Sequence, residues 1–103
     1  MRRMPAVLLA LATANLVFGA VAVQAYSGQK LASKASIGIA QARAIALKAH
    51  PGKITDEELE RERGGSGLRY SFDIKRGSIT QEVGVDAQTG KVLENKKEGP
   101  NPD

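Results

Sequence analysis

His50 is the only histidine of this 103-residue chain, and an imidazole can act as a general base or as a metal ligand. The chain has no cysteine and no second histidine that would complete a zinc site with it. Pro51 follows directly and disfavours helical geometry at His50, so a helix is expected to end there. An imidazolium is electrostatically favourable at the C-terminus of a helix, which indicates a structural role for His50.

Carboxylates crowd into one short stretch of the chain, at Asp56, Glu57, Glu58, Glu60 and Glu62. Hard cations such as Ca²⁺ prefer oxygen ligands, but the stretch lacks the ligand spacing and the glycine of an EF-hand loop. Arginines at positions 61 and 63 also stand inside and beside the acidic run. The pattern therefore indicates a solvated charged element, and we predict no metal site.

The glycine-rich segment Gly64–Gly67 fits neither the dinucleotide-binding pattern nor a Walker loop, and its Ser66 is not part of a G-x-S-x-G motif. Asp86 stands directly before a glycine turn, where a carboxylate commonly caps its own backbone. We find no nucleophile–base pair, no phosphate cradle and no metal constellation. The sequence therefore predicts a protein that is not an enzyme, with no catalytic residue and no cofactor.

The charges and the composition restrict the class of partner. Beyond Arg2 and Arg3 the chain has thirteen basic and eleven acidic residues, which are interspersed along it. Nucleic-acid binders usually cluster Lys and Arg on one face, so we expect no nucleic-acid partner. The absence of cysteine excludes disulfides, thiol catalysis and lipidation at a leader cysteine.

The first 25 residues have the pattern of a signal peptide. Arg2 and Arg3 precede the almost wholly apolar stretch Pro5–Val23, and Val23-Gln24-Ala25 has the ending that signal peptidases read. Cleavage is therefore expected before Tyr26, which would leave a periplasmic or secreted protein without a membrane insertion. The alternative is an uncleaved anchor, because about 20 apolar residues can span a bilayer.

The remaining chain shows one helical pattern followed by strand patterns. Apolar residues recur at helical spacing over Ile39–Ala49, and Pro51 and Gly52 supply the stop signal. The predicted apolar stripe consists of Ile39, Ala42, Ile45, Ala46 and Ala49. Strict alternation of apolar and polar residues then predicts two strands with one buried face each, and a short last strand follows a turn at Asp86 and Gly90. These three strands are expected at Leu68–Lys75, Ile79–Asp86 and Lys91–Asn95.

Lys53–Arg63 is ambiguous from its residues alone. Its Glu, Leu and Arg are good helix formers, and Thr55 begins the pattern of a capping box. A helix here would have almost no apolar face to bury, whereas a strand would place Thr55, Glu57, Leu59 and Arg61 on one side.

These elements predict an α+β fold, in which one N-terminal helix packs on an antiparallel β-meander of three or four strands. Tyr70 and Phe72 are expected to face the helix. The predicted organisation is a signal peptide (1–25), a flexible lead-in (26–36), a domain (37–95) and a disordered tail (96–103).

The chain resembles the PepSY family. The matching pieces, in the order and spacing of that family, are Ile39–Leu47, His50–Ile54, Leu68–Ile74 and Val85–Val92. In this family Lys53–Arg63 forms a strand, and Glu57 stands where the family tends to be apolar. The resemblance implies the α+β fold above and carries no catalytic residues.

PepSY modules occur in propeptides of thermolysin-like metalloproteases and in stand-alone exported proteins. The resemblance thus implies a non-catalytic binding module, which could restrain a peptidase or a membrane-associated protein in trans. The alternative is a periplasmic sensor or accessory module that binds a metal or a small ligand for a membrane system. The sequence does not identify the partner, and it leaves homodimer formation as an open alternative.

A short meander cannot close into a barrel, so two of its strands are edges with unpaired backbone groups. Lys53–Arg63 is expected to be one edge, and an extended partner segment could add to it. The predicted partner-binding residues are Ile54, Glu57, Glu58, Glu60 and Glu62. Substitution of Glu58 or Glu60 by proline is expected to test which residues direct their N–H groups to the open edge.

Overall fold

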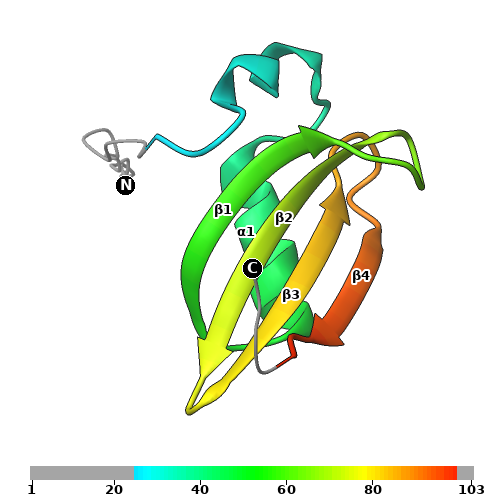
Figure 1. The fold of residues 1–103 in the computed structure, drawn as a ribbon. Coiled ribbons are helices and arrows are strands. Elements are labelled where there is room, and N and C mark those ends of the chain that lie inside the picture. Colours follow the sequence, from blue (N-terminus) through cyan, green and yellow to red (C-terminus); the bar gives the residue numbers. More distant parts are fainter. Residues whose placement is uncertain (1–24, 100–103) are drawn as a thin grey trace, which may run out of the picture.

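The structure, a computed structural model, describes residues 25–99 as one helix packed on one face of a four-stranded antiparallel sheet (Figure 1). The strands lie side by side in chain order, β1-β2-β3-β4. The elements are α1 (Ile39–Ala49), β1 (Lys53–Arg61), β2 (Leu68–Arg76), β3 (Ile79–Asp86) and β4 (Val92–Lys97). This confirms the predicted α+β fold with the larger number of strands.

The core lies between α1 and the inner face of the sheet. Tyr70 and Phe72 are fully buried there, as the alternation in β2 predicts. The helix contributes Ile39, Ala42 and Ala46 to this core. Ala49 was expected in the same stripe, but it is exposed, because burial of α1 against the sheet ends at Ala46.

β1 is a strand, although its residues alone favour a helix. It ends at Arg61, two residues before the predicted end. Its pairing with β2 shifts between Ile54 and Asp56, so Thr55 is the extra residue of a β-bulge. The bulge overturns the expected parity: Ile54 rather than Thr55 shares the inner side with Glu57 and Leu59, since these three residues lie opposite inner-face residues of β2.

The segment before α1 differs from the flexible lead-in that was expected. It contains a 3₁₀ helix, Gln29–Lys34, and Ser27 forms a parallel bridge with Glu58 of β1. Tyr26, Leu31 and Ala32 pack against the core, so apolar contacts hold this segment on the domain.

The end of the sheet also differs from the expectation. β4 continues through Lys96 and Lys97, which were assigned to a disordered tail, and the Glu98 N–H donates to Thr80 O at 2.9 Å. Pairing of β4 with β3 accounts for the longer strand. No helix within residues 25–99 is long and apolar enough to cross a membrane. Residues 1–24 of the predicted leader and 100–103 of the predicted tail lie outside the described residues.

Candidate functional site

The free edge of β1 is partly covered by the chain's own N-terminal segment. The Leu59 N–H donates to Ser27 O at 2.8 Å, so Leu59 directs its backbone groups away from β2. Gly28 lies so close that a Cβ atom on it would come within 1.8 Å of Leu59 O, and its φ of 80° suits glycine. Residues 27 and 28 thus occupy the edge beside Glu58 and Leu59.

The direction of the Leu59 N–H settles which residues of β1 face the edge. Successive residues of a strand direct their backbone groups to opposite sides, so Glu57 faces the edge with Leu59 while Glu58 and Glu60 face β2. Substitution of Glu58 or Glu60 by proline would therefore break pairing with β2, and neither substitution tests the edge. The sequence did not reveal this parity.

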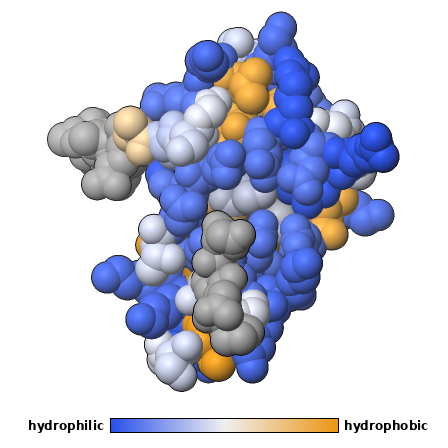
Figure 2. Space-filling view, in the orientation of Figure 1, coloured by the Kyte–Doolittle hydropathy of each residue, from blue (hydrophilic) through white to orange (hydrophobic). Residues whose placement is uncertain are grey.

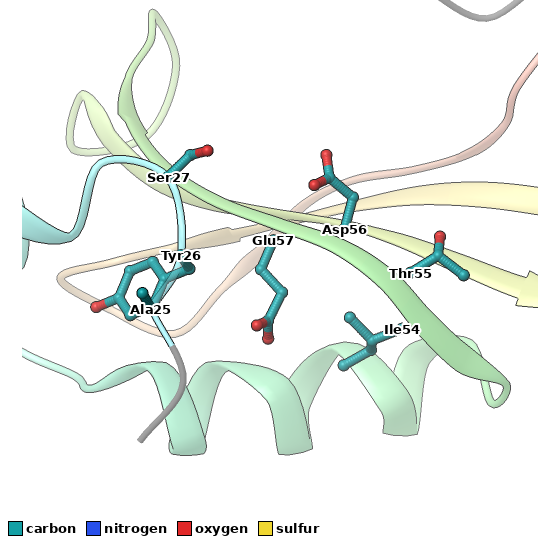
Figure 3. A pocket seen from close by; sticks show the side chains of 7 residues that line it. All are labelled: Ala25, Tyr26, Ser27, Ile54, Thr55, Asp56 and Glu57. Carbon is teal, nitrogen blue, oxygen red and sulfur yellow. The ribbon is translucent and has the colours of Figure 1, made fainter. Parts of the chain in front are cut away.

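A groove of about 510 Å³ lies next to the covered part of the edge (Figure 3). Its lining comes from the N-terminal segment and from the first half of β1: Ala25, Tyr26, Ser27, Ile54, Thr55, Asp56 and Glu57. Tyr26, Ile54 and Glu57 lie on the helix side of β1, and Asp56 points to the opposite side. The groove therefore combines an exposed strand edge with side chains of different character on its two sides.

Glu57, a predicted partner-binding residue, points toward α1 (Figure 3), and its carboxylate pairs with Arg43. Arg43 Nε and Nη2 both donate to the Glu57 carboxylate, the second bond measuring 3.0 Å. The hydrogen bond to Glu57 raises the pKa of Arg43 against the opposing effect of desolvation. Ile54, the other predicted residue on this side, packs against the core.

The other three predicted residues lie away from the helix side of the groove. Glu58 and Glu60 stand on the outer face of the sheet, where the Ser71 hydroxyl donates to Glu60 Oε2 at 2.8 Å. Glu62 follows the end of β1 and lies 3.7 Å from the Arg69 guanidinium. The structure thus distributes the five predicted residues over two faces and does not bring them together as one surface.

Two residues of the site were not singled out from the sequence, Tyr26 and Arg43. The Tyr26 ring packs on the Tyr70 ring with centroids 6.4 Å apart. Burial raises the pKa of Tyr70, and its charge interaction and hydrogen bond with Tyr26 raise it further. An aromatic residue directly after the predicted leader was the available signal for Tyr26. A lone arginine on a helix gives no comparable signal.

The outer face of the sheet carries a second hollow, of about 470 Å³. Carboxylate oxygens of Asp73, Glu82 and Glu98 lie within 4.8 Å of one another there. Burial raises the pKa of Asp73, where the nearby Asp56 charge adds to the effect and the hydrogen bond with Glu98 opposes it. Burial also raises the pKa of Glu82, together with the neighbouring carboxylates. This arrangement favours retention of a proton or neutralisation by a cation.

The residues predicted to form a turn at Asp86 and Gly90 are held by hydrogen bonds. Asp86 is 1% exposed, and its carboxylate accepts hydrogen bonds from the Ser66 N–H and hydroxyl and from the Gln88 and Thr89 N–H groups. Burial alone would raise the pKa of Asp86, but these hydrogen bonds outweigh it and lower the pKa to about 2. The Gly90 N–H donates to Asp86 O at 2.9 Å, and Gly90 has a φ of 80°.

The helix ends at Ala49, and the C-cap residue His50 donates its N–H to Ala46 O at 2.9 Å. Pro51 and Gly52 then lead into β1, and Gly52 approaches Lys75 O so closely that a Cβ atom would lie 2.6 Å from it. His50 Nε2 is buried, and no hydrogen-bond partner for it lies among residues 25–99.

Comparison with known proteins identifies the domain. Residues 36–96 match the model of the PepSY family, described as the peptidase propeptide and YPEB domain. The match covers more than half of the chain and includes α1, β1, β2, β3 and β4 except for its last residue. No curated protein and no solved structure matches the chain.

Proposed function

The chain belongs to the PepSY family, and on that premise we propose that it is an exported, non-catalytic binding module that restrains a peptidase or another envelope protein in trans. The observation that carries this proposal is the family itself, whose description names peptidase propeptides. The exposed part of the β1 edge supports it, because a strand edge offers backbone groups to an extended partner segment.

Affinity capture from envelope extracts tests the binding role. We expect the tagged protein to enrich one partner, identified by mass spectrometry, and to lower the activity of that partner if it is a peptidase. A partner that is enriched equally by an unrelated exported domain of similar charge would contradict the proposal.

Export belongs to the same proposal. We expect cleavage before Tyr26, because Arg2, Arg3 and the Val23-Gln24-Ala25 ending have the pattern of a signal peptide. Intact-mass analysis of the protein recovered outside the cytoplasm should give a first residue of Tyr26. A mature protein that still begins at Met1 would show an anchor or a cytoplasmic protein instead.

The alternative function, a sensor or accessory module for a metal or small ligand, is favoured by one feature, the carboxylates of Asp73, Glu82 and Glu98. Oxygen ligands of this kind suit Ca²⁺. Calorimetric titration with Ca²⁺ separates the two functions: micromolar binding that Glu82→Gln abolishes supports the alternative. The absence of heat in the same titration rejects it for this cation.

A further inference from the structure

The edge of β1 already pairs with an extended chain segment in this structure. Ser27 forms a parallel bridge with Glu58, and the Leu59 N–H donates to Ser27 O at 2.8 Å. The edge is therefore accessible to an extended segment at this position. Strand addition by another polypeptide uses the same backbone geometry.

The segment covers only part of the edge. Ser27 bridges to β1 at Glu58. Residues Ile54–Glu57 line the open groove next to that bridge (Figure 3). The Glu57 N–H faces the same side as that of Leu59, because backbone directions alternate along a strand. The groove thus reaches the Glu57 N–H, which β2 does not use, and the bulge residue Thr55 interrupts the regular alternation beyond it.

The two sides of the groove differ in chemistry. On the helix side, Ile54 and Tyr26 both pack against the core, and the charge of Glu57 is already paired with Arg43. On the opposite side Asp56 is exposed and has no ion pair within residues 25–99. The carboxylate of Glu58 stands on that same outer side.

We propose that the groove binds an extended polypeptide segment in which basic and apolar side chains alternate. The segment adds to β1 along Ile54–Glu57, next to Tyr26 and Ser27, with its basic side chains on the side of Asp56 and its apolar side chains over Ile54 and Tyr26. Side chains of a strand point alternately to its two faces, so one added strand reaches both sides of the groove. This inference rests on the proposed binding function and specifies the chemistry of the partner.

A short synthetic peptide provides the probe. An acetylated and amidated heptapeptide of alternating lysine and valine should bind the protein as purified after export. A peptide of alternating glutamate and valine should bind at least tenfold more weakly, as should the lysine peptide with a central proline. Equal binding of all three peptides would overturn the proposal.

Amide hydrogen exchange locates the bound peptide. In the free protein the Leu59 amide should exchange slowly, because Ser27 accepts its hydrogen bond, and the Glu57 amide should exchange fast. The lysine peptide should slow exchange at Glu57 and leave Leu59 slow. Loss of protection at Leu59 would mean that the peptide displaces Ser27, which contradicts addition beside it. Protection of Glu57 without peptide, together with a dimer in sedimentation, would assign the groove to a second copy.

A charge reversal with a matched control completes the test. Asp56→Lys should weaken binding of the lysine peptide about tenfold, since it replaces an attraction by a repulsion, and should strengthen binding of the glutamate peptide. Glu62→Lys is the control, because it makes the same change of charge beyond the end of β1. It should alter the affinity for the lysine peptide and for the glutamate peptide by no more than about twofold. If an identified envelope partner binds Asp56→Lys as well as the unchanged protein, the binding function stands and this site is wrong.

Discussion

At the scale of single residues, Glu57 shows how a charge is accommodated on the inner side of the sheet. It lies opposite the fully buried Phe72, yet its carboxylate accepts two hydrogen bonds from Arg43 of α1. Removal of either partner would leave a partly desolvated charge without compensation. The pair therefore joins α1 to β1 and withdraws Glu57 from contact with a partner.

Asp86 makes the clearest residue-scale prediction. Because its pKa is about 2 in the folded protein and 3.8 in the reference state, its charged form stabilises the fold by about 2 kcal/mol at neutral pH. Asp86→Asn should cost about 2–3 kcal/mol at pH 7, since an amide NH₂ would face the Ser66 N–H in place of an acceptor. Urea denaturation at pH 7 measures the loss.

The pH dependence of that loss has a definite sign. The folded pKa of Asp86 is lowered, so its contribution is complete above about pH 4 and disappears as the pH falls toward 2. The difference between Asp86→Asn and the unchanged protein should shrink over that range. Glu82→Gln is the matched control: the pKa of Glu82 is raised, so this variant should be slightly more stable at pH 7 and lose that advantage on acidification. A constant difference for Asp86→Asn between pH 7 and pH 2.5 would contradict the assignment.

At the scale of elements, β2 and β3 could be predicted from sequence because each has one buried and one polar face. β1 could not be predicted from its own residues, since glutamate-rich segments favour helices and only its place at the sheet makes it a strand. The bulge at Thr55 has no sequence signal, and it decides that Ile54 and Glu57 share a side. The ion pair of Arg43 also depends on how α1 lies over the sheet, which periodicity does not specify.

The packing of α1 on the sheet makes the next prediction. Phe72 is 0% exposed, and its ring stacks near that of Tyr70 with centroids 6.4 Å apart. Phe72→Ala should reduce the free energy of unfolding by about 3–5 kcal/mol, because it removes a large buried ring from a small core. Phe72→Leu fills most of the volume and should cost clearly less. A loss below about 1 kcal/mol for Phe72→Ala in chemical denaturation would show that the ring is not in the core.

Attachment of the N-terminal segment to β1 depends on Gly28. A Cβ atom there would meet Leu59 O at 1.8 Å, and the positive φ is unfavourable for alanine. Gly28→Ala should therefore detach Ser27 from the edge and speed hydrogen exchange of the Leu59 amide at least tenfold. Gly38→Ala is the control, because nothing lies within 4 Å of its Cβ position and its φ of −86° suits alanine. Slow exchange at Leu59 in Gly28→Ala would contradict the pairing.

At the scale of the whole molecule, residues 25–99 form two layers, and none of their helices covers the outer face of the sheet. Helix α1 covers the inner face, while the outer face carries polar side chains from all four strands (Figures 1 and 2). Arg69 lies across this outer face against Gly84, where a Cβ atom would come within 3.1 Å of its Cδ, and reaches Glu94 at 3.2 Å. Such contacts bury Arg69 without a second layer of helices.

The folding unit extends beyond the part of the chain that matches the family. The match begins at residue 36, yet Tyr26 packs on Tyr70, and Leu31, Ala32 and Ala35 pack against the core. Composition could not reveal this, because the segment is short and polar and its apolar residues have no regular spacing. The N-terminal segment takes its position from β1, because it covers part of the edge of that strand.

The last prediction follows from that extent. A chain that begins at Ser36 lacks the ring of Tyr26 and the cover of Leu59, whereas a chain that begins at Tyr26 keeps both. If the lost contacts bury on the order of 100 Å² of apolar surface, the shorter chain should be less stable by about 2–3 kcal/mol. Urea denaturation of the two chains measures the difference, and the Tyr26→Ala variant of the longer chain should account for about half of it. Equal stability of both chains would mean that the contacts of the N-terminal segment with β1 and Tyr70 do not stabilise the domain.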